Sequence, residues 1–416
     1  MITRSSSLSL SSGDTYSYYI DTYDTYNVYD MDIVHIMNWI KNNYTYPRWR
    51  IYVLFPDEKI NYEIPIDDIQ NGGSFSENYQ NGQRRSLSFS LYNEDGKYSP
   101  NINMFWAGTR LRLDRGIQMS DGTVLWVESG IFIVTQAQNS LSVSQKIVQI
   151  TAKDKFSLFE DKTGTLDSSY EIPAGSDIQQ VIQTILLTDN GDGNPLDSRP
   201  IVYHSSLVGK TVQIAITKSA GETLGSILLE LATQLSSEIF YNAQGLLTII
   251  PVDEVSLDIN KPVVLECNEE EGDINQLDFT FDMNSIVNRI VVIGSSVNGG
   301  AVTAVAVNDD PGSPLCYQRI GYRTGNVIND SNITTKILAQ ERAQYELRKT
   351  LILQSSTTVN VLFNPLLSVN NLVTITSEFF GLTHERFLIQ SISCPLGYGG
   401  EMSITVTNVR NLPSLI

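Results

Sequence analysis

Apolar and polar residues alternate with a period of two through much of the last third of the chain. In the segment Thr357–Phe363, for example, Val359, Val361 and Phe363 fall on one side and Asn360 lies between them. Such alternation predicts antiparallel strands with one buried face and one hydrated face. An amphipathic helix is predicted just before these strands, at Asn332–Lys349. Three further strands are predicted at Leu372–Ser377, Arg386–Ile392 and Glu401–Asn408.

A second region of strands is predicted between Trp49 and Ala152. In SLSFSLY, Leu87, Phe89 and Leu91 share one face, and Asp121-Gly122 is typical of a two-residue hairpin turn. The strands predicted here are Ile51–Phe55, Ser86–Tyr92, Thr109–Leu113, Val124–Val127, Ile131–Thr135 and Lys146–Thr151.

The pattern changes to helical spacing in the middle of the chain, about residues 157–255. Ser176 and Gln179 have the spacing of a capping box ahead of a first helix. A second helix is predicted over Glu222–Phe240, followed by a strand, the turn Asn-Ala-Gln-Gly and another strand in IFYNAQGLLTIIPV. The apolar stripes of the two helices are Ile178, Val181, Ile182, Ile185 and Leu186, and then Leu224, Ile227, Leu228, Leu231, Leu235 and Ile239.

A glycine-rich segment, Gly294–Gly300, separates two apolar runs at 285–293 and 301–307. A phosphate-binding loop requires lysine and then serine or threonine after its second glycine, where this chain has Gly300 and Ala301. The segment therefore predicts a hairpin turn at Asn298-Gly299, and we expect no nucleotide site there.

Residues 1–46 differ from the rest of the chain. Their first part is rich in serine, and they contain eight of the twenty tyrosines, three of them in Asp-Thr-Tyr units. Tyrosine rings bury apolar area while keeping a polar hydroxyl, which favours an extended arm that packs on another surface over a free tail. Val28, Met31, Val34, Met37 and Ile40 also have the spacing of one helical face.

Composition limits the classes of function. The 46 acidic and 28 basic residues give a net charge of −18, which argues against a large phosphate-gripping surface. The three cysteines, Cys267, Cys316 and Cys394, lie far apart in sequence and suit a reducing cytoplasm. With neither a signal-like start nor a run of about 18 apolar residues, we expect no export by that route and no membrane insertion by this chain.

Candidate catalytic and metal-binding residues do not form a recognisable motif. His35, His204 and His384 lack a nucleophile or metal-ligand pattern around them. The segment Asp189–Asp197 lacks the residue order of a calcium loop and predicts a Gly/Asn-rich turn. We therefore expect no catalytic residues, no cofactor and no metal. The cluster Glu266, Glu269, Glu270, Glu271 and Asp273 predicts a hydrated loop, and Trp106 and Trp126 are interpreted as strand packing.

Several segments together carry a family resemblance. The order of helix, strand, NPLLSVNNLVTIT, strand and GYGGEMSITVTNV resembles the last tube-forming domain of baseplate hub proteins from contractile phage tails and related injection machines. NEDGKYSPNINMFWAGTRLRLDRGI followed by SGIFIVTQA is similar to the first tube domain of that family, and YNAQGLLTIIP to its outer domain.

The resemblance implies a mainly β chain with an α+β insertion. The resemblance covers about Trp49 to Asn411 and implies a first barrel-like tube domain at 48–153, an outer α+β domain at 154–272 and a second tube domain at 273–416. The arm at 1–46 lies outside the family pattern and is assigned from its own composition. Three chains would then form a pseudo-sixfold ring of six tube domains. The acidic loop marks the boundary before the hairpin, which is expected to return the chain to the tube.

The function implied is structural. A homotrimeric hub in the virion baseplate, made in the bacterial cytoplasm, would join sixfold tail tube ring proteins to a separate spike protein, contact baseplate wedge proteins and let DNA only pass through its lumen. We expect no enzyme activity. Two alternatives stay open: a glycan-binding or glycan-degrading tail protein, and the hub of a non-phage contractile bacteriocin.

Overall fold

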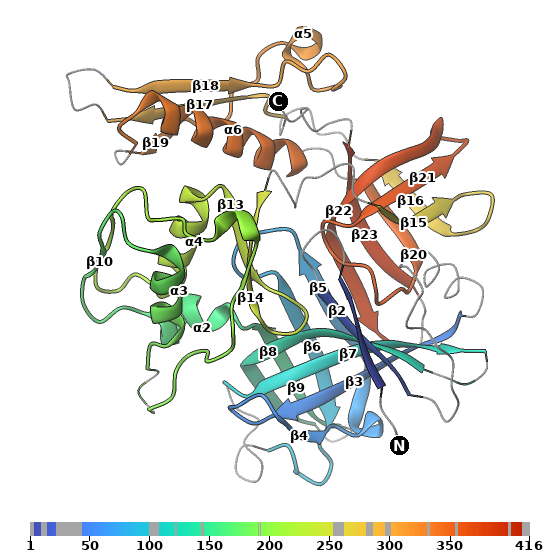
Figure 1. Ribbon diagram of the computed structural model, residues 1–416. Coiled ribbons are helices and arrows are strands. Elements are labelled where there is room, and N and C mark those ends of the chain that lie inside the picture. Colours follow the sequence, from blue (N-terminus) through green and yellow to red (C-terminus); the bar gives the residue numbers. More distant parts are fainter. Residues whose placement is uncertain are drawn as a thin grey trace. The chain divides into compact units, whose positions relative to one another are not determined.

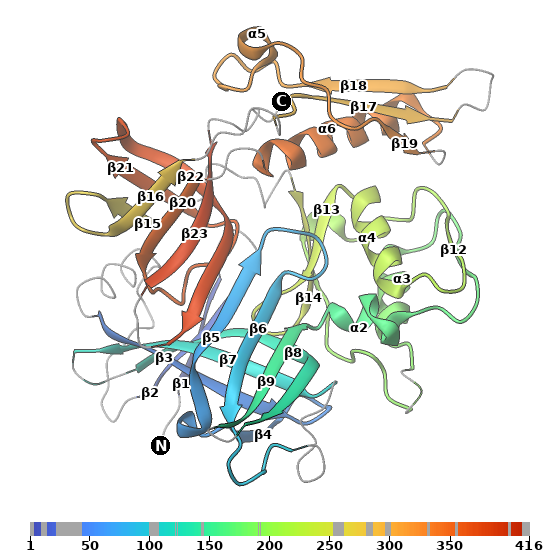
Figure 2. The ribbon, with the colours of Figure 1, turned by 180° about the vertical axis from the view of Figure 1, so that it is seen from behind.

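The protein is mainly β, as its alternation pattern predicts. The computed structural model describes residues 4–9, 15–21, 44–99, 108–120, 122, 124–142, 145–189, 191, 193–252, 262–279, 286–295, 301–330, 333–353, 357–397 and 401–409 (Figures 1 and 2). The chain divides into two compact units. Unit 1 is Met1–Ser256, Leu362–Val369 and Ser391–Ser403, and unit 2 is Leu257–Val361, Asn370–Gln390 and Ile404–Ile416.

Unit 1 contains a domain of antiparallel strands in the order β5-β6-β9-β8-β7-β3-β4. The end of β22 (Leu382–Leu396) pairs with β5 through Ser391–Leu396. The two predicted strands at 124–127 and 131–135 are one continuous strand, β8. The strands are β3 (Tyr44–Leu54), β4 (Ile60–Glu63), β5 (Ile69–Asn78), β6 (Arg85–Tyr92), β7 (Arg110–Met119), β8 (Val124–Leu141) and β9 (Lys146–Asp154).

Strand β6 shows why the alternation forms this sheet. Its leucine and phenylalanine side chains are buried, whereas its serines are half-buried on the opposite face. The hydroxyls of Ser88 and Ser74 lie 2.9 Å apart across the β5–β6 pair, and those of Ser86 and Ser76 lie 2.7 Å apart. Cross-strand hydroxyl pairs of this kind stabilise neighbouring strands while one face stays polar. Closure of the sheet into a barrel remains a prediction.

The N-terminal arm is extended where the structure describes it. Strands β1 (Arg4–Ser9) and β2 (Thr15–Asp21) form an antiparallel hairpin, and β2 pairs with the first residues of β8, from Val124 to Val127. The first strand of the sheet already begins at Tyr44, inside the segment assigned to the arm. The predicted helical stripe from Val28 to Ile40, together with His35, lies outside the described residues.

An α+β domain follows within unit 1. Its sheet has the order β11-β14-β13, and β10 pairs with β12. One apolar cluster fills the space between its two main helices and the sheet, and includes Ile182, Leu228, Leu231 and Ile249. The elements are α2 (Ser157–Glu160), β10 (Tyr170–Ile172), α3 (Ile178–Leu186), β11 (Val202–Tyr203), β12 (Ile216–Lys218), α4 (Leu224–Gln234), β13 (Ser237–Tyr241) and β14 (Leu247–Pro251).

Two details of these helices differ from the sequence prediction. Helix α3 is capped by Asp177, whose carboxylate accepts the backbone N–H of Gln180; the predicted cap, Ser176, instead donates its hydroxyl to the carbonyl of Pro173. Helix α4 ends near Gln234 and does not reach Phe240. Ser236 has a left-handed φ of 49°, which stops the helix, and the residues beyond it pair with β14.

Unit 2 contains a sheet in the order β15-β21-β22-β23-β20-β16. All four strands predicted in the last third of the chain are present in it, and the strand β22 is longer than predicted. The acidic cluster lies on β15 and in the turn that connects it to β16, where Glu269, Glu270 and Glu271 are exposed. The strands are β15 (Val263–Asn268), β16 (Ile274–Phe279), β20 (Thr357–Leu362) as far as Val361, β21 (Leu372–Ser377), β22 as far as Gln390, and β23 (Glu401–Asn408) from Ile404 onward.

A second sheet of unit 2 packs on the long helix, α6 (Lys336–Leu353), which starts and ends four residues later than predicted. Strands β17 (Arg289–Gly294), β18 (Thr303–Val307) and β19 (Ile328–Asp330) form it in the order β18-β17-β19, and α5 (Tyr317–Ile320) lies between β18 and β19 in the chain. Its core includes Val292, Ala339, Ala343, Leu347 and Leu351. The predicted hairpin therefore forms, but among the described residues it belongs to a separate sheet that builds its own core with α6. The turn Asn298-Gly299 lies outside the described residues.

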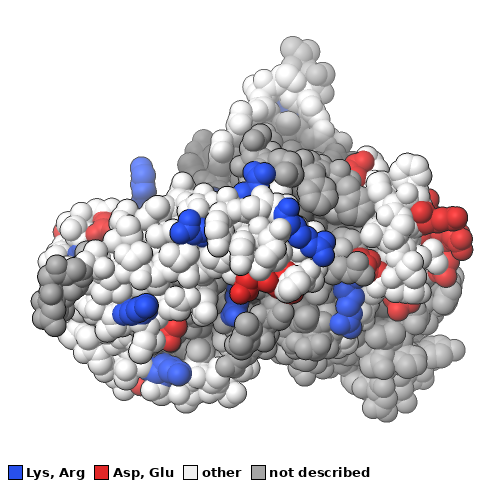
Figure 3. Space-filling model, turned by 90° about the horizontal axis from the view of Figure 1, so that it is seen from above, with Lys and Arg blue, Asp and Glu red and all other residues white. Residues whose placement is uncertain are grey.

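Acidic side chains are unevenly distributed over the one face that Figure 3 shows. Figure 3 shows them gathered on the right-hand side, which is the side of β15 and β16 in Figure 1. In the part of the chain that the structure describes, no helix combines the length and apolar character needed to cross a membrane.

The left-handed Ser236 gives a test of the helix boundary. A left-handed conformation costs an ordinary residue about 1 kcal/mol and costs glycine little. We expect Ser236→Gly to raise the melting temperature by about 2 °C. The neighbouring Ser237→Gly should lower it, because Ser237 is buried in β13 and donates its hydroxyl to the carbonyl of Leu235. Differential scanning calorimetry of both variants checks this, and a lower melting temperature for Ser236→Gly would contradict it.

Candidate functional site

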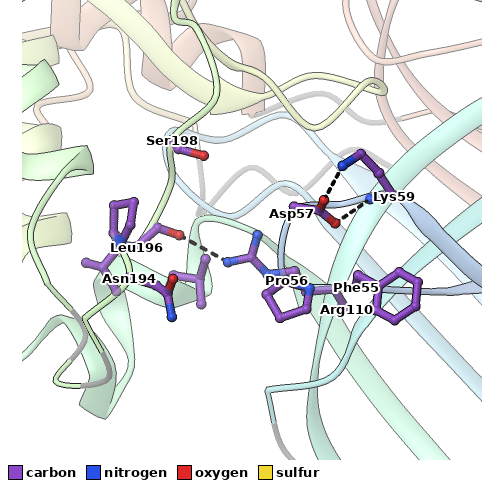
Figure 4. Close-up of a pocket in the computed structure, with 10 residues that line it drawn as sticks. Phe55, Pro56, Asp57, Lys59, Arg110, Asn194, Leu196 and Ser198 are labelled. Atoms are coloured by element: carbon purple, nitrogen blue, oxygen red, sulfur yellow. Dashed lines mark hydrogen bonds and ion pairs between the residues drawn. The ribbon is translucent and has the colours of Figure 1, made fainter.

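A pocket of about 610 Å³ lies in unit 1, where the β3–β4 turn meets the loop after α3 (Figure 4). Its walls include the apolar side chains of Phe55, Pro56 and Leu196. Its charged side chains already have partners. Lys59 forms an ion pair with Asp57, and Arg110 donates from Nη2 to the carbonyl oxygen of Leu196 at 3.2 Å.

Glu58, in the same turn, is the centre of a buried ion network. Its side chain is only 2% exposed and contacts three cations: Lys155 Nζ at 2.5 Å, Arg199 Nη1 at 2.7 Å and Arg110 Nη1 at 3.0 Å. The backbone of Glu58 is left-handed, with a φ of 63°. A left-handed backbone is unfavourable for glutamate. The ion pairs of the buried Glu58 carboxylate with its three cationic partners offset that cost.

Lys155 extends this network into the α+β domain. It is completely buried and contacts Asp197 Oδ2 at 2.8 Å, while donating to the carbonyl oxygen of Gly245 at 3.1 Å. The hydroxyl of Tyr241 donates to the same Asp197 oxygen at 2.7 Å. Burial, and then the neighbouring Asp197 carboxylate, raise the pKa of Tyr241 well above its usual value, so this hydroxyl stays protonated as a donor.

A second buried group lies at the start of β6. The carboxylate of Asp154 accepts the backbone N–H groups of Arg84, Arg85 and Phe156 at 2.7, 2.8 and 3.1 Å. Burial raises the pKa of Asp154 to about 6, although these hydrogen bonds oppose the rise. Arg84 forms an ion pair with Glu238 of β13, and its guanidinium lies 3.5 Å from the ring centre of Phe240.

Glu77, the ion-pair partner of Arg85, connects the group around Asp154 to Ser368 in the Leu362–Val369 segment. Arg85 forms an ion pair with Glu77 and donates to the carbonyl oxygen of Tyr241. Glu77 in turn accepts the hydroxyl of Ser368 at 2.9 Å. The ion network around Glu58, Lys155 and Asp197 and the group around Asp154, Arg84 and Arg85 together hold the α+β domain and the Leu362–Val369 segment on the strand domain. We call these contacts the joint. Its charged side chains are paired with one another, as in a structural contact between domains.

Residues that the sequence marked as candidates lie apart from this joint, with one exception. His204 caps a short helix, η3 (Ser205–Leu207), and His384 is exposed with a φ of 47°. Asp189 accepts the backbone N–H groups of Gly191 and Gly193 and so shapes a turn, as expected. Asp197, at the end of the same segment, is the exception because it belongs to the ion network.

The remaining candidates either have packing roles or lie outside the described residues. Trp126 is buried in β8, with the guanidinium of Arg50 over its ring at 4.1 Å, which confirms the interpretation as strand packing. Trp106 lies outside the described residues. Within the ranges described above, no cluster of three His, Cys, Asp or Glu side chains could hold a metal ion. Cys267, Cys316 and Cys394 are buried, and none of the three is in a disulfide.

Little in the sequence indicates these buried ion pairs. Glu58 stands in Pro-Asp-Glu-Lys, a segment that reads as an ordinary hydrated turn. A weak signal lies in Ala-Lys-Asp-Lys-Phe at 152–156, where charged residues directly continue an apolar strand without a turn residue. Such residues are buried with partners when the chain does not leave the core.

Comparison with known proteins shows a likeness in fold. Neither a protein-family model nor a curated protein sequence matches the chain. Among solved structures, the 43 kDa tail protein of prophage MuSo2 from Shewanella oneidensis matches with a TM-score of 0.58 and 15% identity, over 88% of this chain and 99% of that chain. The tail protein of Neisseria meningitidis MC58 matches with a TM-score of 0.59 and 12% identity, over the same shares of both chains.

A chain of the Francisella PdpA–VgrG complex, in its half-lidded form, also matches, with a TM-score of 0.52 and 9% identity. That match covers 89% of this chain and 59% of the other. The protein therefore has a fold that occurs both in phage tail proteins and in a VgrG complex. It spans almost the whole length of the two tail proteins.

The buried ion network predicts that substitutions of Glu58 and of its neighbour Asp57 have different effects on stability. Glu58→Gln removes the countercharge of three cations, and breaking a buried ion pair in this way costs about 3–5 kcal/mol. Asp57→Asn changes an exposed pair in the same turn and should leave stability unchanged, because exposed pairs contribute little. Thermal and urea unfolding of both variants measure the difference. Equal stability of the two variants would show that the Glu58 network does not hold the joint.

Proposed function

We propose that this protein is a structural component of a phage tail, and more specifically the baseplate hub at the tip of the tail. The observation that carries the proposal is the fold shared with two tail proteins along nearly their full length. In this role three copies join the sixfold tail tube to a threefold spike. The chain itself is proposed to have no enzyme activity.

The strand edges support an assembled state. Strand β4 is the last strand at one end of the unit 1 sheet, and all four of its side chains are exposed. Ile60 is 49% exposed and Tyr62 37%, and next to them Phe55 is 47% and Ile66 46% exposed. An apolar edge strand is normally covered in a working protein, because it otherwise pairs with foreign strands. A neighbouring copy in a closed ring is the cover that we propose.

The charge fits a conduit that lets DNA pass without binding it. A net charge of −18 repels a polyanion, and the serine face of β5 and β6 offers hydroxyls in place of lysine and arginine. The partners that follow are the tail tube ring, the spike and the baseplate wedge proteins, in the tail of a virion. The likeness to a chain of the PdpA–VgrG complex supports a second candidate, the hub of an injection machine without a capsid, such as a contractile bacteriocin.

The ring predicts a trimer. We expect the purified chain to have three times its monomer mass of 46.3 kDa at micromolar concentration, because neighbouring copies cover the open edges. Mass photometry and sedimentation velocity measure this. Placing a charge in the edge with Tyr62→Lys should shift the population toward monomers, whereas Leu141→Lys, at an exposed site away from β4, should not. A wild-type chain that stays a folded monomer would rule out the hub.

We expect deletion of the N-terminal arm to impair assembly of particles but not folding of the chain. Deleting residues 1–43, just before β3 begins, removes the β1–β2 hairpin and leaves the main strands of unit 1 in place. We expect a melting temperature within about 2–4 °C of that of the full chain, corresponding to at most about 1 kcal/mol, but fewer assembled particles. A large loss of melting temperature would make the arm part of the core, and normal particle yield would make it dispensable.

A further inference from the structure

Two phenylalanines stand exposed at the tip of the β21–β22 hairpin in unit 2. Phe379 is 82% exposed and Phe380 is 40% exposed, and their rings contact edge to face with centroids 4.9 Å apart. Phe379 is the most exposed of the large apolar side chains that the structure describes. Rings of this size are normally buried, so their position at a tip marks an interaction surface.

The tip is a defined turn and holds the rings in place. Gly381 adopts a left-handed φ of 65°, and its N–H donates to the carbonyl oxygen of Glu378 at 3.1 Å. The hydroxyl of Ser377 donates to the carboxylate of Glu269 at 2.5 Å and accepts the N–H of Phe380 at 3.4 Å. A preorganised pair of aromatic rings loses little conformational freedom on binding, which favours a specific partner.

Negative charge lies close to these rings. Glu378 directly precedes Phe379, and Glu269, Glu270 and Glu271 are exposed in the turn after β15, the strand that pairs with β21. The turn with Glu269, Glu270 and Glu271 is joined directly to the base of the tip, because the N–H of Glu269 donates to the carbonyl oxygen of Thr376. The carboxylates gathered at the right-hand edge of Figure 3 lie on the side of this region.

We propose that the Phe379–Phe380 tip inserts into an apolar pocket bordered by lysine and arginine on a different polypeptide of the assembly. This inference rests on the proposed function, since it assigns the tip to a contact of the hub with another tail protein. An anionic membrane surface would be repelled by the nearby carboxylates. A second copy of this chain is a poorer partner for the same reason, because every copy carries the same excess of acid.

The test replaces the rings and the charges separately. Particles are assembled in cells that carry the complete set of tail genes, with this gene supplied as wild type, as Phe379→Ser/Phe380→Ser or as Glu270→Lys/Glu271→Lys. We expect each double variant to lower the yield of complete particles at least tenfold. The matched control is Leu141→Ser, which removes an apolar side chain that is 80% exposed elsewhere and should leave the yield unchanged.

Cross-linking identifies the partner. With p-benzoylphenylalanine at position 379, irradiation of complete particles should join this chain to a different polypeptide, at apolar residues flanked by lysine or arginine. A cross-link to a second copy of this chain or to lipid would overturn the proposal, and so would normal particle yield from the phenylalanine variant.

The oligomeric state separates this inference from the proposed function. All variants should have the same mass and melting temperature as the wild-type chain, because Phe379, Phe380, Glu270 and Glu271 are all exposed in the folded chain. A trimer with a dispensable tip would overturn only the inference. A monomeric wild-type chain would overturn the hub itself, whatever the cross-link shows.

Discussion

Buried charge at the joint of unit 1 is the constraint on which the arrangement of its two domains depends. A carboxylate and an ammonium group lose several kcal/mol of hydration each on burial, and only close partners offset that loss. Glu58, Lys155 and Asp197 meet this requirement with distances of 2.5 to 2.8 Å. Apolar surfaces can slide past one another at little cost, whereas these charges would lose their partners after a shift of a few ångströms. The joint therefore fixes one orientation of the α+β domain on the strands.

The same turn that supplies Glu58 also supplies part of the outer surface. Phe55 precedes it and is half exposed, and the edge strand β4 follows it. The left-handed backbone of Glu58 points its side chain inward while the neighbouring residues face solvent. A perturbation of the joint would consequently reach the edge that we propose to contact a neighbouring copy. Folding of the chain and the proposed contact with a neighbouring copy thus involve one short segment.

Sequence reasoning located most elements because they follow local periodicity. The four strands of the last third of the chain, the helix α6 and the strand-turn-strand at 237–251 were all predictable in this way. The end of α4 was not, because the apolar stripe continues into Ile239 and only the backbone of Ser236 reveals the break. The separate sheet of β17 and β18 was missed because a hairpin pattern does not say which surface it packs against.

The joint was not predictable for a related reason. Glu58 and Arg199 are 141 residues apart in sequence, and Arg84 and Glu238 are 154 apart. A charged residue reads as hydrated until its partner is known, since burial of charge is decided by distant contacts. In the sequence, Asp197 is only the last residue of a glycine-rich turn. Its role in the structure depends on its contacts with Lys155 and Tyr241.

Two kinds of charge in this protein therefore act in different ways. Those of the joint are neutralised by one another in the interior, where salt has little access, and they serve folding. The carboxylates nearest to Phe379 and Phe380, which are Glu269, Glu270, Glu271 and Glu378, are exposed. Their field therefore reaches about 8 Å into a solution of physiological ionic strength and is weakened by added salt. Raising the ionic strength should then impair the encounter of the tip with a basic partner well before it affects the folded chain. Because complementary exposed charge acts chiefly on the rate of association, the apolar rings are left to determine how long the contact lasts.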